Sequence, residues 1–248
     1  MLCALWLAGC NNSPYPAGAE KTNTLFYSFD ERSPRYLDPT ASYSNPESAY
    51  TFQIYEPPYG YHYLKRPYEL VPKTALEVAH ARYVDKTGKP LPDDAPGDQI
   101  AESIYEIRIQ PGILYQPHPA FAKDEQGRYR YHALKPGEVG ERRSPLQFEH
   151  QGTRELVADD YVYALKRHAT TRITTPIYGI FSEYVIGLKA YGDLIRAEDK
   201  KLRQGLDPAS LDKPFLDFRR FALEGVSAPD PHTLKIRVAG KYPQWKYW

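Results

Sequence analysis

The feature that most constrains the fold is an alternation of side chains between Ser103 and Gln110. Tyr105, Ile107 and Ile109 occupy alternate positions, and the positions between and beside them are polar except for Ile104. A period of two is typical of a strand with one buried face. Pro111 and Gly112 then predict a turn into a second short strand over residues 113–115.

An amphipathic helix is expected over residues 155–168. Apolar side chains and a histidine recur there at helical spacing: Val157, Tyr161, Ala164, Leu165 and His168. Acidic residues stand near its start and basic residues near its end, as the helix dipole favours. The 39 residues from 116 to 154 separate strand and helix, and we expect a surface excursion because such long loops are usually functional or mobile.

Three further elements follow from local patterns. Residues 24–30 and 81–85 are expected to be strands. Asn45, with a proline and Glu47 after it, predicts the N-cap of a helix that runs from Glu47 to Tyr55, before two prolines end it. Residues 178–196 become helical towards their end, and residues 198–214 are expected to be a charged connection.

The amino-terminus is apolar over residues 1–9, which is too short for a membrane-spanning helix but matches the core of a signal peptide. Residues 7–10, Leu-Ala-Gly-Cys, resemble a bacterial lipobox. That resemblance implies cleavage before Cys10 and acylation of its thiol, followed by a polar tether over residues 11–23. A buried strand with a core cysteine is the alternative, which the Asn- and Pro-containing tether disfavours.

Composition excludes several function classes. Cys3 and Cys10 are the two cysteines, so a processed chain would have neither a disulfide nor a cysteine-based zinc site. The net charge of +1 gives no indication of nucleic-acid binding. His118, His132 and His150 of the insertion do not have metal-ligand spacing, so we expect surface histidines and no metal or cofactor.

Several segments together resemble the family 5 extracellular solute-binding proteins of ABC transporters. The long insertion is a departure from that family's pattern. The matching residues are Leu37, Asp38 and Pro39; Ile54, Tyr55, Glu56, Leu70 and Pro72; Tyr105, Ile107, Arg108, Gly112, Ala158, Asp160, Val162, Ala164, Leu165 and Arg167; and Gly225, Val226, Asp230, Thr233, Leu234, Ile236, Val238, Tyr242 and Pro243. The last group also alternates as a hairpin strand should.

The resemblance implies a mixed α/β (α+β) chain that forms one lobe of a two-lobe, class II periplasmic-binding-protein fold. Residues 24–248 would be most of lobe I, with an outer subdomain over about residues 41–221. Members of the family are longer, so we expect a fragment or an interrupted gene, an incomplete sheet and an exposed sheet edge.

The function implied by the resemblance is capture of peptides in the periplasm for import, by a monomeric lipoprotein that partners a permease and an ATPase. Family members place the segment before Leu-Asp-Pro along the cleft, which makes Glu31, Ser33, Arg35 and Tyr36 candidate ligand contacts. The simpler interpretation of these residues is a solvated loop of mixed charge.

Other functions stay open at this point. A receptor for a non-peptide solute fits the same resemblance, and a structural envelope lipoprotein fits Cys10 and the 22 tyrosines. A glycan hydrolase would need two positioned carboxylates. Asp159 and Asp160 are adjacent, so in a helix they point in different directions and are better interpreted as helix-terminal charge. We therefore expect no enzyme.

Overall fold

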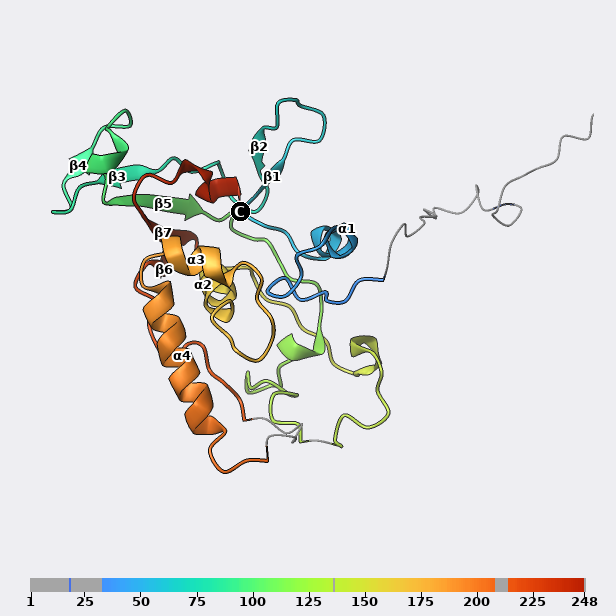
Figure 1. Ribbon diagram of the computed structural model, residues 1–248. Helices are drawn as coiled ribbons and strands as arrows, with labels where there is room; N and C mark the ends of the chain where they lie inside the picture. The colour runs from blue at the N-terminus through green and yellow to red at the C-terminus, as the bar shows by residue number, and fades with distance from the viewer. Residues whose placement is uncertain (1–17, 19–32, 136, 208–213, 248) are drawn as a thin grey trace, which may run out of the picture.

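The structure is a computed structural model that describes residues 18, 33–135, 137–207 and 214–247 (Figure 1). It mixes helices and strands, as expected. Its helices are α1 (Asn45–Ile54), α2 (Ala158–Arg167), α3 (Tyr178–Tyr184) and α4 (Leu188–Leu202). Its strands are β1 (Tyr59–Tyr61), β2 (Leu70–Pro72), β3 (Arg82–Val84), β4 (Pro90–Leu91), β5 (Glu102–Arg108), β6 (Val226–Asp230) and β7 (Thr233–Ala239). Short 3₁₀ turns are η2 (Gly97–Gln99), η3 (Pro119–Phe121), η4 (Pro145–Gln147) and η5 (Pro243–Tyr247).

A five-stranded antiparallel sheet in the order β4-β3-β5-β7-β6 organises the chain. Its centre is the pairing of β5 with β7, which runs without interruption from Glu102 opposite Ala239 to Arg108 opposite Thr233. The predicted strand at residues 103–110, the strand at 81–85 and the carboxyl-terminal hairpin are all present. The predicted strand at residues 24–30 lies outside the described residues.

One face of this sheet forms the core. Cross-strand partners on that face are Ser103 with Val238, Tyr105 with Ile236, and Ile107 with Leu234, and each of these residues is at most 5% exposed. The period-two pattern therefore predicted the buried parity correctly. The Tyr105 hydroxyl donates to the carbonyl of Tyr242 at 3.0 Å, which satisfies the one polar group that this ring carries into the core.

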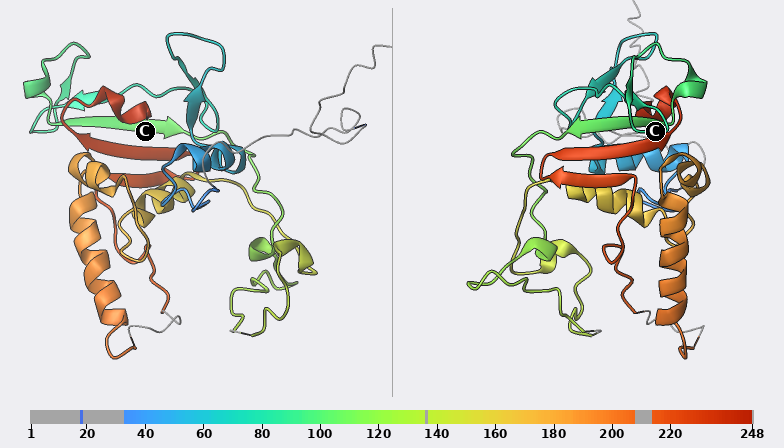
Figure 2. Two further views of the ribbon diagram at one scale, coloured as in Figure 1. Left: turned by 45° about the vertical axis from the view of Figure 1, so that its right-hand side comes forward. Right: turned by 90° about the vertical axis from the view of Figure 1, so that its left-hand side faces the viewer.

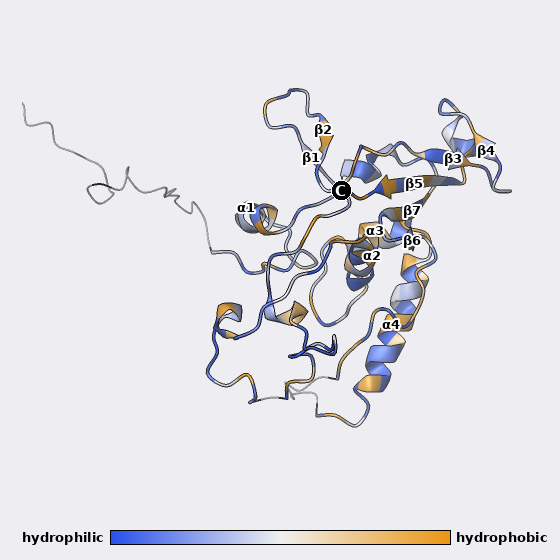
Figure 3. Ribbon diagram, turned by 180° about the vertical axis from the view of Figure 1, so that it is seen from behind, coloured by the Kyte–Doolittle hydropathy of each residue, from blue (hydrophilic) through white to orange (hydrophobic). Residues whose placement is uncertain are grey.

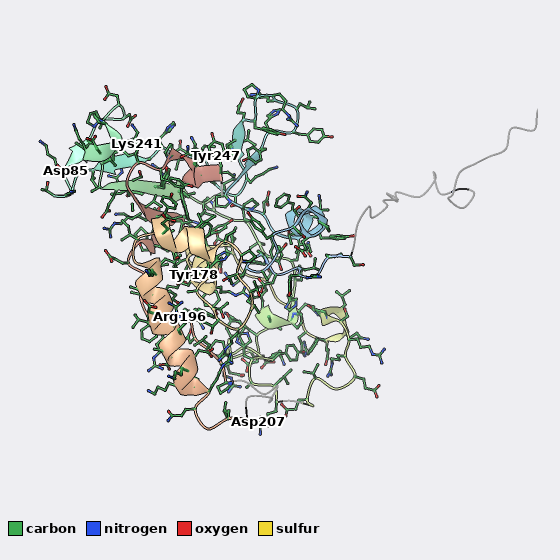
Figure 4. The ribbon with its side chains drawn as sticks, viewed as in Figure 1. Asp85, Tyr178, Arg196, Asp207, Lys241 and Tyr247 are labelled. Carbon is green, nitrogen blue, oxygen red and sulfur yellow. The ribbon has the colours of Figure 1, made fainter. Side chains whose placement is uncertain are left out.

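Helices α2, α3 and α4 lie below the sheet on this face (Figure 2). Leu188, Tyr191 and Ile195 of α4 are at most 2% exposed and recur at helical spacing. The ribbon of α4 therefore changes repeatedly between hydrophobic and hydrophilic colouring in Figure 3. The hydroxyl of Tyr178 from α3 packs against α4 at Gly192, and a Cβ at that position would collide with this hydroxyl. Figure 4 labels Tyr178 and also Arg196 of α4.

Helix α2 forms over residues 158–167, within the predicted range. Its buried stripe is Ala158, Val162 and Lys166, whereas Ala164 is exposed. The predicted apolar face was thus partly wrong, although Tyr161 and Leu165 do pack against the core. Lys166 can be buried because its ammonium donates to the carbonyl of Phe221 at 3.0 Å. Burial lowers its pKa because removal from water disfavours the charged form.

Three local predictions need correction. Residues 113–115 form no strand, and Leu114 makes an isolated bridge to Glu155. The N-cap of α1 is Ser44 rather than Asn45. Helix α4 continues to Leu202, into the region expected to be a charged connection, because Asp199 there is buried and held by Arg172 and Arg203.

The insertion over residues 116–154 is a surface excursion, as expected. It hangs away from the sheet in Figure 1 and contains the 3₁₀ turns η3 and η4 but no long element. An isolated bridge from His118 to Gly152 closes its base. Gly152 has no room for a Cβ because the backbone of Phe121 and Ala122 crosses it closely.

Candidate functional site

The Asp38 loop, which we define as residues 33–44, contains three of the four predicted ligand contacts. Ser33, Arg35 and Tyr36 are described and exposed, and Tyr36 is 48% exposed. Glu31 and the predicted lipidation site Cys10 lie outside the described residues. The structure therefore places the three described contacts on one surface segment.

The centre of the loop is a turn organised by Asp38. The amides of Ala41 and Ser42 donate to its carbonyl at 3.0 and 2.8 Å, and the Thr40 amide donates to its Oδ1 at 3.0 Å. Aspartate side chains commonly accept from the backbone amide two positions on in this way. Thr40 and Ala41 are buried, at 3% and 6% exposed, so this part of the loop is an anchor rather than a contact surface.

Asp38 also forms an ion pair with Arg167 at the end of α2. Two guanidinium nitrogens donate to the two carboxylate oxygens at 3.1 and 2.5 Å, which is a bidentate geometry. Burial on its own would raise the pKa of Asp38, but the hydrogen bonds from Arg167 and from the Thr40 amide outweigh it, and the pKa is lowered. The pair joins two segments that are 129 positions apart.

Glu47 of α1 holds both ends of the Asp38 loop. Its Oε1 accepts from the Arg35 amide at 3.2 Å, and its Oε2 accepts from the amides of Tyr43 and Ser44 at 3.2 and 2.9 Å. The Ser44 hydroxyl adds a bond of 2.6 Å. These donors, above all the Ser44 hydroxyl, lower the pKa of Glu47 to about 2. A carboxylate that stays ionised therefore ties the loop to the start of α1.

Tyr161 of α2 fixes the chain on the other side of α1. Its hydroxyl donates to the carbonyl of Glu56 at 3.0 Å and lies 2.5 Å from the hydroxyl of Thr74, which is fully buried. Burial raises the pKa of Tyr161 to about 12. Helix α2 thus holds the segments before and after α1 through two side chains, Arg167 and Tyr161.

The exposed side chains of this region are polar and aromatic. Arg35 and Tyr36 are exposed on the Asp38 loop, Tyr43 of the same loop is 71% exposed, and Phe52 of α1 is 76% exposed. A guanidinium can bind a carboxylate bidentately, and a tyrosine offers apolar area together with a hydroxyl. The arrangement offers groups that can contact a small polar molecule.

His168 follows Arg167 in the chain and is the C-cap of α2. Its ring packs edge-on against Phe181, with centroids 5.3 Å apart, and its Nδ1 is buried without a hydrogen-bond partner among the described residues. Burial, with a smaller contribution from the Arg167 charge, lowers the pKa of His168 to about 4. This histidine is therefore neutral at pH 7.

Sequence reasoning missed Glu47, Tyr161 and the partner of Arg167. The Ser44-x-x-Glu47 spacing is a capping-box pattern and could have revealed the role of Glu47. Nothing in the local sequence indicates that Tyr161 reaches Glu56 and Thr74. Asp38 and Arg167 both stood among the residues of the family resemblance, but no local pattern pairs them.

Other candidate chemistry is accounted for by structural contacts. Asp160 accepts from the Val157 amide at 3.0 Å and pairs with Arg154, so it caps α2, while Asp159 is exposed. Within the described ranges, no group of three His, Cys, Asp or Glu side chains could hold a metal ion. None of the helices described is both long enough and apolar enough to cross a bilayer.

Comparisons with known proteins give a coarse likeness among solved structures. No family model matches the chain, and a search of curated proteins finds no match. Among solved structures, the murein tripeptide binding protein MppA of Escherichia coli aligns with a TM-score of 0.43 and 16% sequence identity. The alignment covers 86% of this chain and 26% of that one, so this chain spans about a quarter of its length.

The pKa of His168 predicts a pH dependence of stability. The unfolded histidine has a pKa near 6.5 and the folded one about 4, so the unfolded state takes up the proton first as the pH falls. The free energy of unfolding should therefore decrease as the pH falls from 6.5 to 4. The contribution of His168 to this decrease should be about 2 kcal/mol between pH 7 and pH 5. Urea unfolding at both pH values measures the loss, which His168→Gln should remove. His80→Gln, at an exposed histidine, should leave it unchanged; equal losses in wild type and His168→Gln would contradict the assignment.

Proposed function

We propose that this chain belongs to a solute-binding component of an ABC importer that captures peptides. The observation that carries the proposal is the ion pair between Asp38 and Arg167. Each residue stands in a different segment that resembles the family 5 solute-binding proteins, and a chance resemblance of two separate segments would give no reason for their side chains to meet. A third resembling segment, β6 with β7, pairs with β5 of the second.

In this proposal, the exposed part of the Asp38 loop contacts the peptide. A bound peptide would lie extended and hydrogen-bond through its backbone, which tolerates many sequences. Arg35 would bind a carboxylate of the peptide, and Glu31 would bind its amino-terminal ammonium. Tyr36 and Ser33 would contact its backbone and side chains. A second lobe, which the family resemblance implies beyond this chain, would close over the ligand.

Native mass spectrometry of the full-length protein, purified without denaturation, tests the proposal. We expect released masses that match short peptides, and saturable rebinding when a mixed tripeptide pool is added to the emptied protein. Arg35→Ala/Tyr36→Ala should weaken rebinding at least tenfold, because a bidentate carboxylate contact and an aromatic contact are both lost.

The matched control is Tyr63→Ala/Arg66→Ala, which removes the same two residue types from the loop between β1 and β2. Tyr63 is 88% exposed there. This control should change rebinding less than twofold. A protein that is purified empty and ignores the peptide pool would contradict the proposal, and equal effects of the two double variants would contradict the site.

We also propose that the protein is a periplasmic lipoprotein anchored through Cys10, acts as a monomer without catalysing a reaction, and delivers its ligand to a permease and an ATPase. The residues in support are the apolar segment 1–9 and the lipobox-like residues 7–10. Two or more acyl chains would give stable anchoring.

Metabolic labelling with a radioactive fatty acid tests the anchor. We expect label in the wild-type protein and a membrane-pelleted product, and neither in Cys10→Ser. Cys3→Ser is the matched control, and its product should be labelled like the wild type because Cys3 would be removed with the signal peptide. Undiminished labelling of Cys10→Ser would contradict acylation at this residue.

A further inference from the structure

The insertion over residues 116–154 contains a hollow, open to solvent and lined by exposed arginines, that the peptide-binding proposal does not use. It has a volume of about 600 Å³. That is within the range of small-molecule sites, about 300–1,000 Å³. Its lining includes three arginines, two tyrosines and a histidine: Arg128, Arg130, Arg142, Tyr129, Tyr131 and His150.

Each of the three guanidinium groups is held by the protein through part of its donor set. Arg128 donates from Nε to Asp124 Oδ2 at 2.8 Å, Arg130 donates from Nε to the Lys123 carbonyl at 3.1 Å, and Arg142 donates from Nη1 to the Val139 carbonyl at 3.0 Å. A guanidinium has five N–H donors, so each keeps several for a ligand. Anchoring reduces the entropy that a flexible arginine loses when it binds.

The charges of the hollow do not cancel. Arg128 is neutralised by Asp124, but neither Arg130 nor Arg142 has a carboxylate within 4.0 Å among the described residues. Asp124 is itself occupied, since the amides of Gln126 and Arg128 also donate to it. The other acidic residue, Glu149, has a side chain that is 85% exposed and lies 3.8 Å from His150. The charge of Arg130 still acts on Asp124 and helps to lower its pKa. The lining therefore carries three guanidinium groups against two carboxylates, and neither Arg130 nor Arg142 is engaged in an ion pair.

Aromatic contacts hold the walls in place. Tyr131 packs edge-on against Phe148 with centroids 4.9 Å apart, and the Arg142 guanidinium lies over the same ring at 5.1 Å. On the other wall, Tyr129 stacks on His132 at 4.0 Å, and the Lys123 ammonium lies 4.9 Å from the Tyr129 ring. A loop without long helices or strands is thus organised around the arginines by ring packing and cation–π contacts.

We propose that this hollow is a binding site for a small organic or inorganic anion that carries at least two oxyanion groups, either carboxylates or phosphates. Guanidinium groups bind both groups bidentately, and two arginines that are not engaged in ion pairs suit a ligand with two such groups. This site is formed by a different segment from the Asp38 loop. A test of anion binding in the insertion is therefore independent of a test of peptide binding at the loop.

Isothermal titration calorimetry of the full chain at low ionic strength tests the site, with citrate as the carboxylate probe and pyrophosphate as the phosphate probe. We expect saturable binding of at least one probe at one site. Arg130→Ala/Arg142→Ala should weaken it at least tenfold. Arg130→Lys keeps the charge and loses the bidentate geometry, so a loss of about threefold to tenfold is expected for it. Circular dichroism of each variant checks that the fold is kept.

Arg143→Ala is the matched control, because Arg143 is an exposed arginine of the same insertion that does not line the hollow. It removes one charge and should weaken binding less than twofold. The response to citrate against pyrophosphate identifies the oxyanion class. Absence of saturable binding for both probes would overturn the proposal, and so would an effect of Arg143→Ala as large as that of the double variant, since binding would then follow diffuse charge.

Discussion

The ion pair between Asp38 and Arg167 is the interaction on which the arrangement of the candidate site depends. It joins the Asp38 loop to the end of α2 in bidentate geometry. Both side chains are 35% exposed, so solvent screening reduces the energy of the pair to about 1–2 kcal/mol. Its importance is positional, because α2 in turn packs against β6 and β7 and carries that fixed position to the loop.

Helix α2 contacts three parts of the structure: the sheet, the segment after α1 and the segment before α1. Ala158 and Val162 bury its inner side against the sheet, Tyr161 holds the chain that follows α1, and Arg167 holds the chain that precedes it. Glu47 then closes the Asp38 loop on α1 through an ionised carboxylate. The loop therefore has a rigid buried base at Thr40 and Ala41 and an exposed edge at Arg35 and Tyr36, which is the division of roles that a preorganised binding surface requires.

The sequence was sufficient for elements that local periodicity determines and insufficient for contacts between distant segments. Strand β5 was predictable because Tyr105 and Ile107 alternate with polar residues, and α2 because acidic and basic residues stand at its two ends. The end of α4 was mispredicted because the burial of Asp199 depends on Arg172 and Arg203, and Arg172 lies outside the helix. The hollow in the insertion could not be predicted, since it depends on which arginines find carboxylates after folding. Of the candidate site, the sequence supplied the exposed residues of the loop but not Glu47 or Tyr161.

A double-mutant cycle on Asp38→Ala and Arg167→Ala, measured by urea unfolding, tests the central claim most directly. If the pair fixes the loop, each single variant should lose stability and the double variant should lose less than their sum, with a coupling energy of about 1–2 kcal/mol. The pair Arg82 and Glu106, exposed by 63% and 44%, is the matched control and should couple by less than about 0.5 kcal/mol. Additive losses for Asp38 and Arg167 would mean that the two segments are held together by something else.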